Sequence, residues 1–141
     1  MKMAGRPRRP RRSALAEREV RRDTPLRRAR TCYDHLAGVA GVALLDSILA
    51  QGWLVPHERT YKITPRGADA FLRRGVDLVT ADASARPFAR SCADWTEPGQ
   101  HLAGALGAAV LSRLTRDGVV RRTPGSRVVA LRRPLAEWLG A

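Results

Sequence analysis

The chain contains the stretch Ala29-Arg30-Thr31-Cys32-Tyr33-Asp34-His35, and a related stretch returns as Ala89-Arg90-Ser91-Cys92-Ala93-Asp94-Trp95. After an insertion of six residues, His35-Leu36-Ala37-Gly38 also returns, as His101-Leu102-Ala103-Gly104. The apolar patterns behind both stretches match as well. Self-similarity over this length indicates an internal repeat, which has to be recognised before a fold is assigned.

The first copy predicts two helices. Apolar residues recur at helical spacing from Gly41 to Gln51, and Asp34 is the expected N-cap because its carboxylate can accept from the free N–H groups of a first turn. Thr64-Pro65 is a cap followed by proline at the first helical position, so it opens a second helix. That helix is expected to bury Ala68, Phe71 and Leu72 and to end near Gly75.

Short strands are predicted between the helices of each copy. They lie at residues 53–55 and 61–63 in the first copy and at 119–120 and 128–131 in the second, around turn-forming residues. Helix, strand, turn, strand and helix in this order is typical of a winged-helix unit.

Leu45 and Leu111 fall at the same place in the two copies and are predicted to be buried in one core. Neither copy has enough apolar surface to be stable alone. We therefore predict a mainly α fold with small β-wings (α+β), in which two tandem winged-helix-like repeats pack on each other. The expected units are a basic arm at 1–25, a first repeat at 26–80 and a second repeat at 81–141.

Positive charge gathers at the start of the chain. The net charge is +13, and residues 1–30 carry 12 Lys and Arg against three acidic residues. Such an arm is expected to be extended, and it is either a phosphate-binding arm for nucleic acid or a solubilising tail. If it binds DNA, the candidate phosphate contacts are Arg6, Arg8, Arg9, Arg11 and Arg12 in the arm, with Arg59 and Lys62 on the first wing.

Several classes of protein are excluded by composition. No apolar run is long enough for a membrane span, and the basic start has no apolar segment behind it as a signal peptide would, so we expect a cytoplasmic protein. The two cysteines are too few for a disulfide scaffold. No phosphate loop, His-Glu-x-x-His or Gly-x-Ser-x-Gly motif is present, so we expect a non-enzyme without an obligatory cofactor.

The two cysteines allow two interpretations, and the more specific one is a metal site. Cys32 and His35 are three residues apart, which on a helix places them on one face; if the halves pack about a pseudo-twofold axis, Cys92 and His101 approach them. Two sulfurs and two nitrogens suit zinc or another thiophilic metal. The alternative is that both cysteines are small buried apolar residues at the interface of the halves. Trp95, which stands where the first copy has His35, favours the alternative.

Four stretches together resemble bacterial ArsR-type winged-helix transcriptional regulators: Arg30–Gly38, Tyr61–Gly67, Cys92–Glu97 and His101–Gly104. The resemblance covers residues 26–141 and implies the C-terminal regulatory half, without the usual N-terminal helix-turn-helix domain. The function expected from it is DNA binding through the arm and a wing. The alternative is a ligand- or metal-sensing interaction module without DNA binding of its own, acting as a homodimer or through a full-length regulator.

Overall fold

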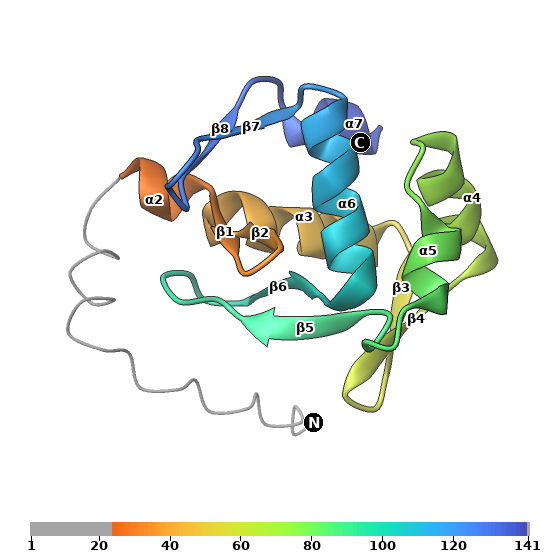
Figure 1. Cartoon of the computed structure of the whole chain (residues 1–141). Coiled ribbons are helices and arrows are strands. Elements are labelled where there is room, and N and C mark those ends of the chain that lie inside the picture. Colours follow the sequence, from red (N-terminus) through yellow and green to blue (C-terminus); the bar gives the residue numbers. More distant parts are fainter. Residues whose placement is uncertain (1–23, 141) are drawn as a thin grey trace.

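The computed structural model describes residues 24–140 and shows an α+β fold with three small antiparallel sheets (Figure 1). The described part falls into two halves with the same order of elements: a short helix, a hairpin, a long helix, a second hairpin and another helix. No helix in this part is long and apolar enough to cross a membrane.

The first half begins with the short helix α2 and the tight hairpin β1–β2. The long helix α3 follows β2 directly, and the hairpin β3–β4 and helix α4 complete the half. The bounds are α2 Pro25–Arg28, β1 Arg30–Cys32, β2 His35–Ala37, α3 Gly38–Ala50, β3 Leu54–His57, β4 Thr60–Ile63 and α4 Pro65–Arg73.

The second half repeats this order with a longer first hairpin loop. Helix α6 follows β6 directly and has the same 13-residue length as α3. The bounds are α5 Leu78–Ala83, β5 Arg90–Ala93, β6 Gln100–Ala103, α6 Gly104–Arg116, β7 Val120–Arg122, β8 Val129–Leu131 and α7 Leu135–Leu139.

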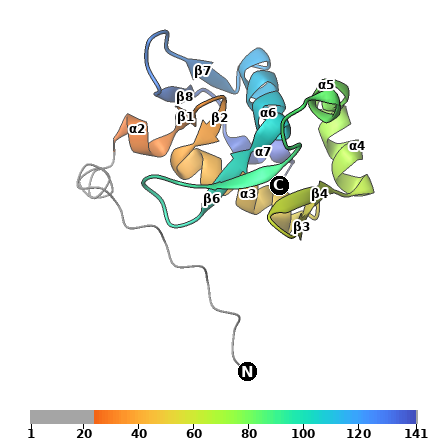
Figure 2. The same cartoon turned by 60° about the horizontal axis from the view of Figure 1, so that its bottom comes forward.

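Strands of the two halves pair with each other at two places. Strand β4 of the first half pairs with β5 of the second through Thr60 and Arg90, which makes the four-stranded sheet β3–β4–β5–β6. At the other side, Val128 beside β8 forms a bridge with Arg30 of β1. Figure 2 shows the two outer hairpins, β3–β4 and β7–β8, at opposite ends of the molecule. The second hairpin of each half is therefore bonded to the first hairpin of the other half.

The core lies between α3 and α6 and belongs to both halves. Leu45 on α3 and Leu111 on α6 are each 2% exposed, as predicted, and one continuous cluster of buried apolar side chains contains both. Helix α3 packs on β6 and α6 packs on β2, so each long helix covers the hairpin of the opposite half.

Gly41 on α3 and Gly107 on α6 allow each long helix to lie close to the hairpin of the opposite half. A Cβ added to Gly41 would collide with the carbonyl oxygen of Leu36 and lie 3.3 Å from the Cβ of His101. A Cβ added to Gly107 would lie 2.7 Å from the carbonyl oxygen of Leu102 and 3.2 Å from the Cβ of His35. The contacts are reciprocal between the halves.

Some sequence predictions are confirmed and others are wrong. Thr64 caps α4 and Pro65 opens it, as predicted. Asp34 is not a helix cap, because α3 begins at Gly38 directly after β2 and Asp34 lies in the β1–β2 turn. Leu72 is 58% exposed, since the narrow apolar face of α4 points Ala70 and Phe71 inward instead.

Candidate functional site

Cys32 and His35 lie on two strands, not on one helix face as predicted. They are directly opposite each other across β1 and β2. The intervening residues Tyr33 and Asp34 form the turn, and Tyr33 has a left-handed φ of 62°. A two-residue turn makes residues three apart into a cross-strand pair. The side chains of Cys32 and His35 still lie on the same face, because they are a cross-strand pair of a hairpin and not neighbours on a helix.

Cys92 and His101 form the matching pair on β5 and β6, again directly opposite each other. The six inserted residues belong to the loop 94–99 and leave the strand register unchanged. His101 therefore occupies the strand position that corresponds to His35. Trp95 does not, so the sequence argument that counted Trp95 against a metal site was wrong.

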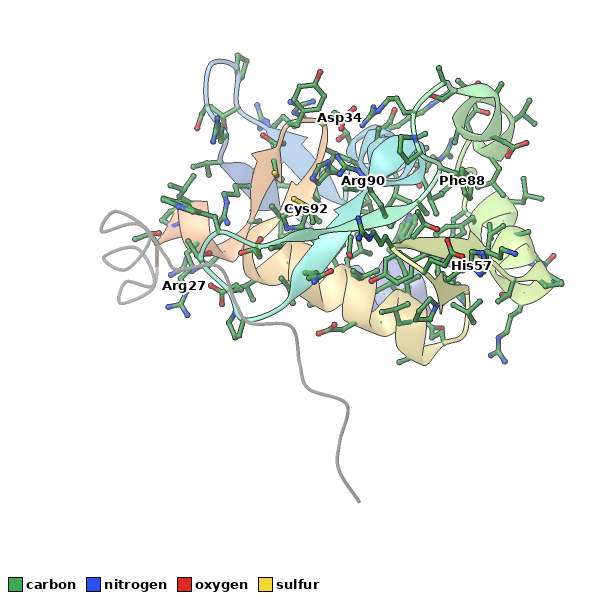
Figure 3. The ribbon with its side chains drawn as sticks, turned by 90° about the horizontal axis from the view of Figure 1, so that it is seen from below. Arg27, Asp34, His57, Phe88, Arg90 and Cys92 are labelled. Atoms are coloured by element: carbon green, nitrogen blue, oxygen red, sulfur yellow. The ribbon has the colours of Figure 1, made fainter. Side chains whose placement is uncertain are left out.

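The two pairs meet at the junction of the halves. One ligand atom from each of Cys32, His35, Cys92 and His101, a sulfur or a ring nitrogen, lies within 4.8 Å of the other three. The His35 and His101 rings are 4.9 Å apart between centroids. Figure 3 shows Cys92 on β5 below the hairpin turn that carries Asp34. The structure thus brings together all four residues that the sequence nominated.

Each histidine has an aspartate at one ring nitrogen. His101 Nδ1 lies 2.8 Å from Asp94 Oδ1, and His35 Nδ1 lies 3.4 Å from Asp34 Oδ1. An ionised carboxylate only accepts hydrogen bonds, so these contacts favour the tautomer with the proton on Nδ1. Both Nε2 atoms are buried and have no hydrogen-bond partner among the described residues. In that tautomer each Nε2 carries a lone pair that no described group satisfies.

Asp94 is the most heavily bonded side chain of the site. Besides His101 it accepts from Arg30 at 3.1 Å and from the backbone N–H groups of Gly38, Thr96 and Glu97 at 2.9–3.1 Å. The Asp94 side chain is fully buried and that of Arg30 is 5% exposed. Asp34 is half-exposed and pairs with Arg86. The two aspartates therefore support their histidines from different surroundings.

Burial and charge set the protonation of the cluster. Burial, together with the neighbouring His101, lowers the pKa of His35 and keeps its ring neutral. Burial and the nearby Cys32 raise the pKa of the Cys92 thiol. Burial alone would raise the pKa of Asp94, but hydrogen bonds from His101 and Gly38 and the Arg30 charge outweigh it, and the pKa lies well below its usual range. A neutral His35 ring and a protonated Cys92 thiol thus lie in one site with the ionised carboxylate of Asp94.

A pocket of about 570 Å³ opens beside the cluster. Cys32 and His101 line it together with Arg30 and Trp95, whose ring centroid lies 5.3 Å from the Arg30 guanidinium carbon. Two of the four cluster residues therefore border this pocket, and His35 and Cys92 do not.

Only two of the predicted DNA-contact residues can be placed in the structure. Arg6, Arg8, Arg9, Arg11 and Arg12 are outside the described residues. Arg59 and Lys62 are exposed on the hairpin β3–β4, away from the cluster. The structure therefore does not join these two residues to the four-residue cluster.

Sequence reasoning missed a more basic hairpin. Arg121 and Arg122 on β7 and Arg127 before β8 are exposed, and no acidic residue stands between Val119 and Pro134. Helix α2 contacts β8, so the described part of the chain begins beside this hairpin. The run of arginines was visible in the sequence, but its position beside helix α2 required the tertiary structure.

The comparisons point to one kind of protein. Over 118 residues the chain is 38% identical to the uncharacterized HTH-type transcriptional regulator YdfF of Bacillus subtilis (strain 168). The chain is similar to a transcriptional regulator. The match covers 84% of this chain and 51% of YdfF, so the chain spans about half the length of that relative. No family model and no solved structure matches the chain.

Proposed function

We propose that the chain is the regulatory half of an ArsR-type transcriptional regulator and contacts the phosphate backbone of DNA. The observation that carries this proposal is the 38% identity to YdfF, whose name describes a helix-turn-helix transcriptional regulator. The four stretches that resemble ArsR-type regulators lie within the same region of the chain.

The order of elements supports a winged-helix origin for each half. A long helix, a hairpin and a further helix follow one another as α3, β3–β4, α4 and as α6, β7–β8, α7. Gly52 and Gly118, at the ends of the two long helices, have left-handed φ values of 72° and 71°. Matching backbone at matching positions supports two diverged copies of one winged-helix-like unit. In such units the hairpin is the wing.

We assign the phosphate contacts to the arm and the β7–β8 hairpin. Arg121, Arg122 and Arg127 project from one exposed hairpin, and α2 places the start of the described chain against β8. Arginine donors neutralise phosphates independently of base sequence. The β3–β4 hairpin with Arg59 and Lys62 lies at the other end of the molecule (Figure 1) and adds at most a second, weaker contact.

Gel shifts with the DNA upstream of the chain's own gene test this assignment. The full chain is expected to bind at low salt. The triple variant Arg121→Gln, Arg122→Gln, Arg127→Gln is expected to weaken binding by more than the matched double variant Arg59→Gln, Lys62→Gln. No binding by the wild-type chain at low salt would contradict the proposal and favour a sensing or interaction module that acts through a partner. Equal losses in both variants would contradict the assignment to β7–β8.

A further inference from the structure

We propose that Cys32, His35, Cys92 and His101 bind one Zn²⁺ ion in a tetrahedral site of two sulfur and two nitrogen ligands. The inference goes beyond DNA binding and does not depend on it.

The spacing of the donor atoms fits this ion. Zinc binds sulfur at about 2.3 Å and imidazole nitrogen at about 2.0–2.1 Å, so the donors of a tetrahedral site lie roughly 3.3–3.8 Å apart. The four donors of this cluster lie within 4.8 Å of one another. Side-chain shifts of about 1 Å would close the site around an ion without moving the strands, because both Cys–His pairs are already in cross-strand register.

The histidine nitrogens provide the second observation. The Nε2 atoms of His35 and His101 are buried without a hydrogen-bond partner among the described residues. Buried polar atoms in folded proteins nearly always have a partner, and an exception calls for a physical reason. Two such nitrogens in rings 4.9 Å apart, next to two thiols, share one explanation: a cation bound between them.

The aspartates act as positioning residues for these ligands. Histidines that bind a metal usually donate the other ring N–H to a carboxylate, a backbone carbonyl or a water molecule, which fixes the ring and its tautomer. Asp94 holds His101 at 2.8 Å and Asp34 approaches His35 at 3.4 Å. Because Asp94 is itself held by Arg30 and by three backbone N–H groups, the ring of His101 is preorganised.

The donor set selects the class of metal. Thiolate and imidazole favour zinc and similar thiophilic ions over calcium or magnesium, which prefer oxygen. Two thiols lose their protons on binding and the two imidazoles stay neutral, so two thiolates balance the charge of Zn²⁺ and two protons are released. Four protein ligands leave no open position, which is typical of a structural site.

The site would tie the two halves together. One Cys–His pair comes from β1–β2 and the other from β5–β6. β2 and β6 each run directly into a long helix, at Gly38 and Gly104. A bound ion therefore fixes the starting points of α3 and α6 relative to each other.

Cobalt titration of the full-length chain tests the proposal. The chain is stripped of metal with a chelator under reducing conditions and titrated with Co²⁺. We expect saturation at one equivalent, the intense d–d bands of tetrahedral cobalt and a thiolate-to-cobalt charge-transfer band. Added Zn²⁺ should remove all of these bands and protect both thiols from a thiol reagent.

Three variants complete the test. Cys92→Ser and His101→Gln should each weaken zinc binding at least about tenfold. His57→Gln, which changes an exposed histidine far from Cys92 (Figure 3), should bind like the wild-type chain. Circular dichroism of the metal-free proteins identifies a variant that fails to fold, and the wild-type cobalt spectrum decides the question independently of the variants.

Three results would overturn the proposal. The first is a weak octahedral cobalt spectrum in the wild-type chain, and the second is an unchanged tetrahedral spectrum in Cys92→Ser. The third is a reduced chain that takes up no zinc but forms a Cys32–Cys92 disulfide on mild oxidation. The last result would assign the cysteines to thiol redox chemistry.

Discussion

The carboxylate of Asp94 accepts a hydrogen bond of 2.9 Å from the backbone N–H of Gly38, the first residue of α3. The N-cap residue of α3, Ala37, makes no side-chain hydrogen bond to the helix start. A side chain of the second half therefore satisfies one of the free N–H groups at the start of the first half's long helix. The same carboxylate holds Arg30 and His101, so one buried side chain links the helix start, the ion pair and the cluster.

We predict that Asp94→Asn destabilises the fold by about 3–5 kcal/mol, because removing one member of a buried ion pair leaves the charge of Arg30 uncompensated. The backbone donors at residues 38, 96 and 97 would also face a weaker acceptor. Guanidinium unfolding followed by circular dichroism measures the loss.

Asp34→Asn is the matched control for this change. Asp34 supports His35 but is half-exposed, and its partner Arg86 lies at the surface. Exposed ion pairs contribute about 0–1 kcal/mol, so the control should stay close to the wild-type stability. Equal losses in the two variants would contradict the distinct roles given to the two aspartates.

Leu45→Ala and Leu111→Ala should each lower the free energy of unfolding by about 2–5 kcal/mol, the usual cost of truncating a buried leucine. Both side chains belong to one apolar cluster, so each variant should unfold in a single transition with both halves lost together. Calorimetry and tryptophan fluorescence check this. Two separate transitions, each sensitive to one leucine, would show two independent cores.

Gly41→Ala and Gly107→Ala should disturb the fold more than a glycine replacement elsewhere. The new methyl groups would meet a backbone carbonyl and a cluster histidine from the opposite half. Gly118→Ala is the control, since its left-handed backbone costs only about 1–2 kcal/mol and nothing lies within 4 Å of the added carbon. Thermal unfolding gives the order of stabilities. If Gly118→Ala proved the most damaging, the close packing of helix on hairpin would not be the constraint.

Part of this architecture could be read from the sequence. The recurrence of the Cys32 and Cys92 stretches predicted equivalent positions, and Leu45 and Leu111 are indeed buried together. Thr64-Pro65 marked a helix start because capping and proline act locally. The four cluster residues were nominated from residue type and repeat position alone, and the structure brings their ligand atoms together.

Other features depend on contacts distant in the chain. The left-handed Tyr33 turns a helix-like spacing into a hairpin, and nothing in its side chain signals that conformation. The sequence offered two counterparts of His35, Trp95 before the insertion and His101 after it, and only the strand pairing of Cys92 with His101 decides between them. The partners of Asp94 come from residues up to 64 positions away, which no local pattern reveals.

The arm has its own prediction. Deleting residues 2–12 should leave the free energy of unfolding unchanged, because an arginine- and proline-rich segment buries little apolar surface. It should reduce the salt dependence of DNA binding, since the log–log slope follows the number of neutralised phosphates. Fluorescence anisotropy with labelled duplex measures the slope. An unchanged slope would make the arm a passive tail.

The most direct test of the functional account is the salt dependence of duplex DNA binding by the wild-type chain. If the five candidate arginines of the arm and the three of the β7–β8 hairpin each neutralise one phosphate, the log–log slope of the binding constant against salt should be about −7. A slope between 0 and about −1, or no binding at low salt, would contradict DNA contact through these arginines.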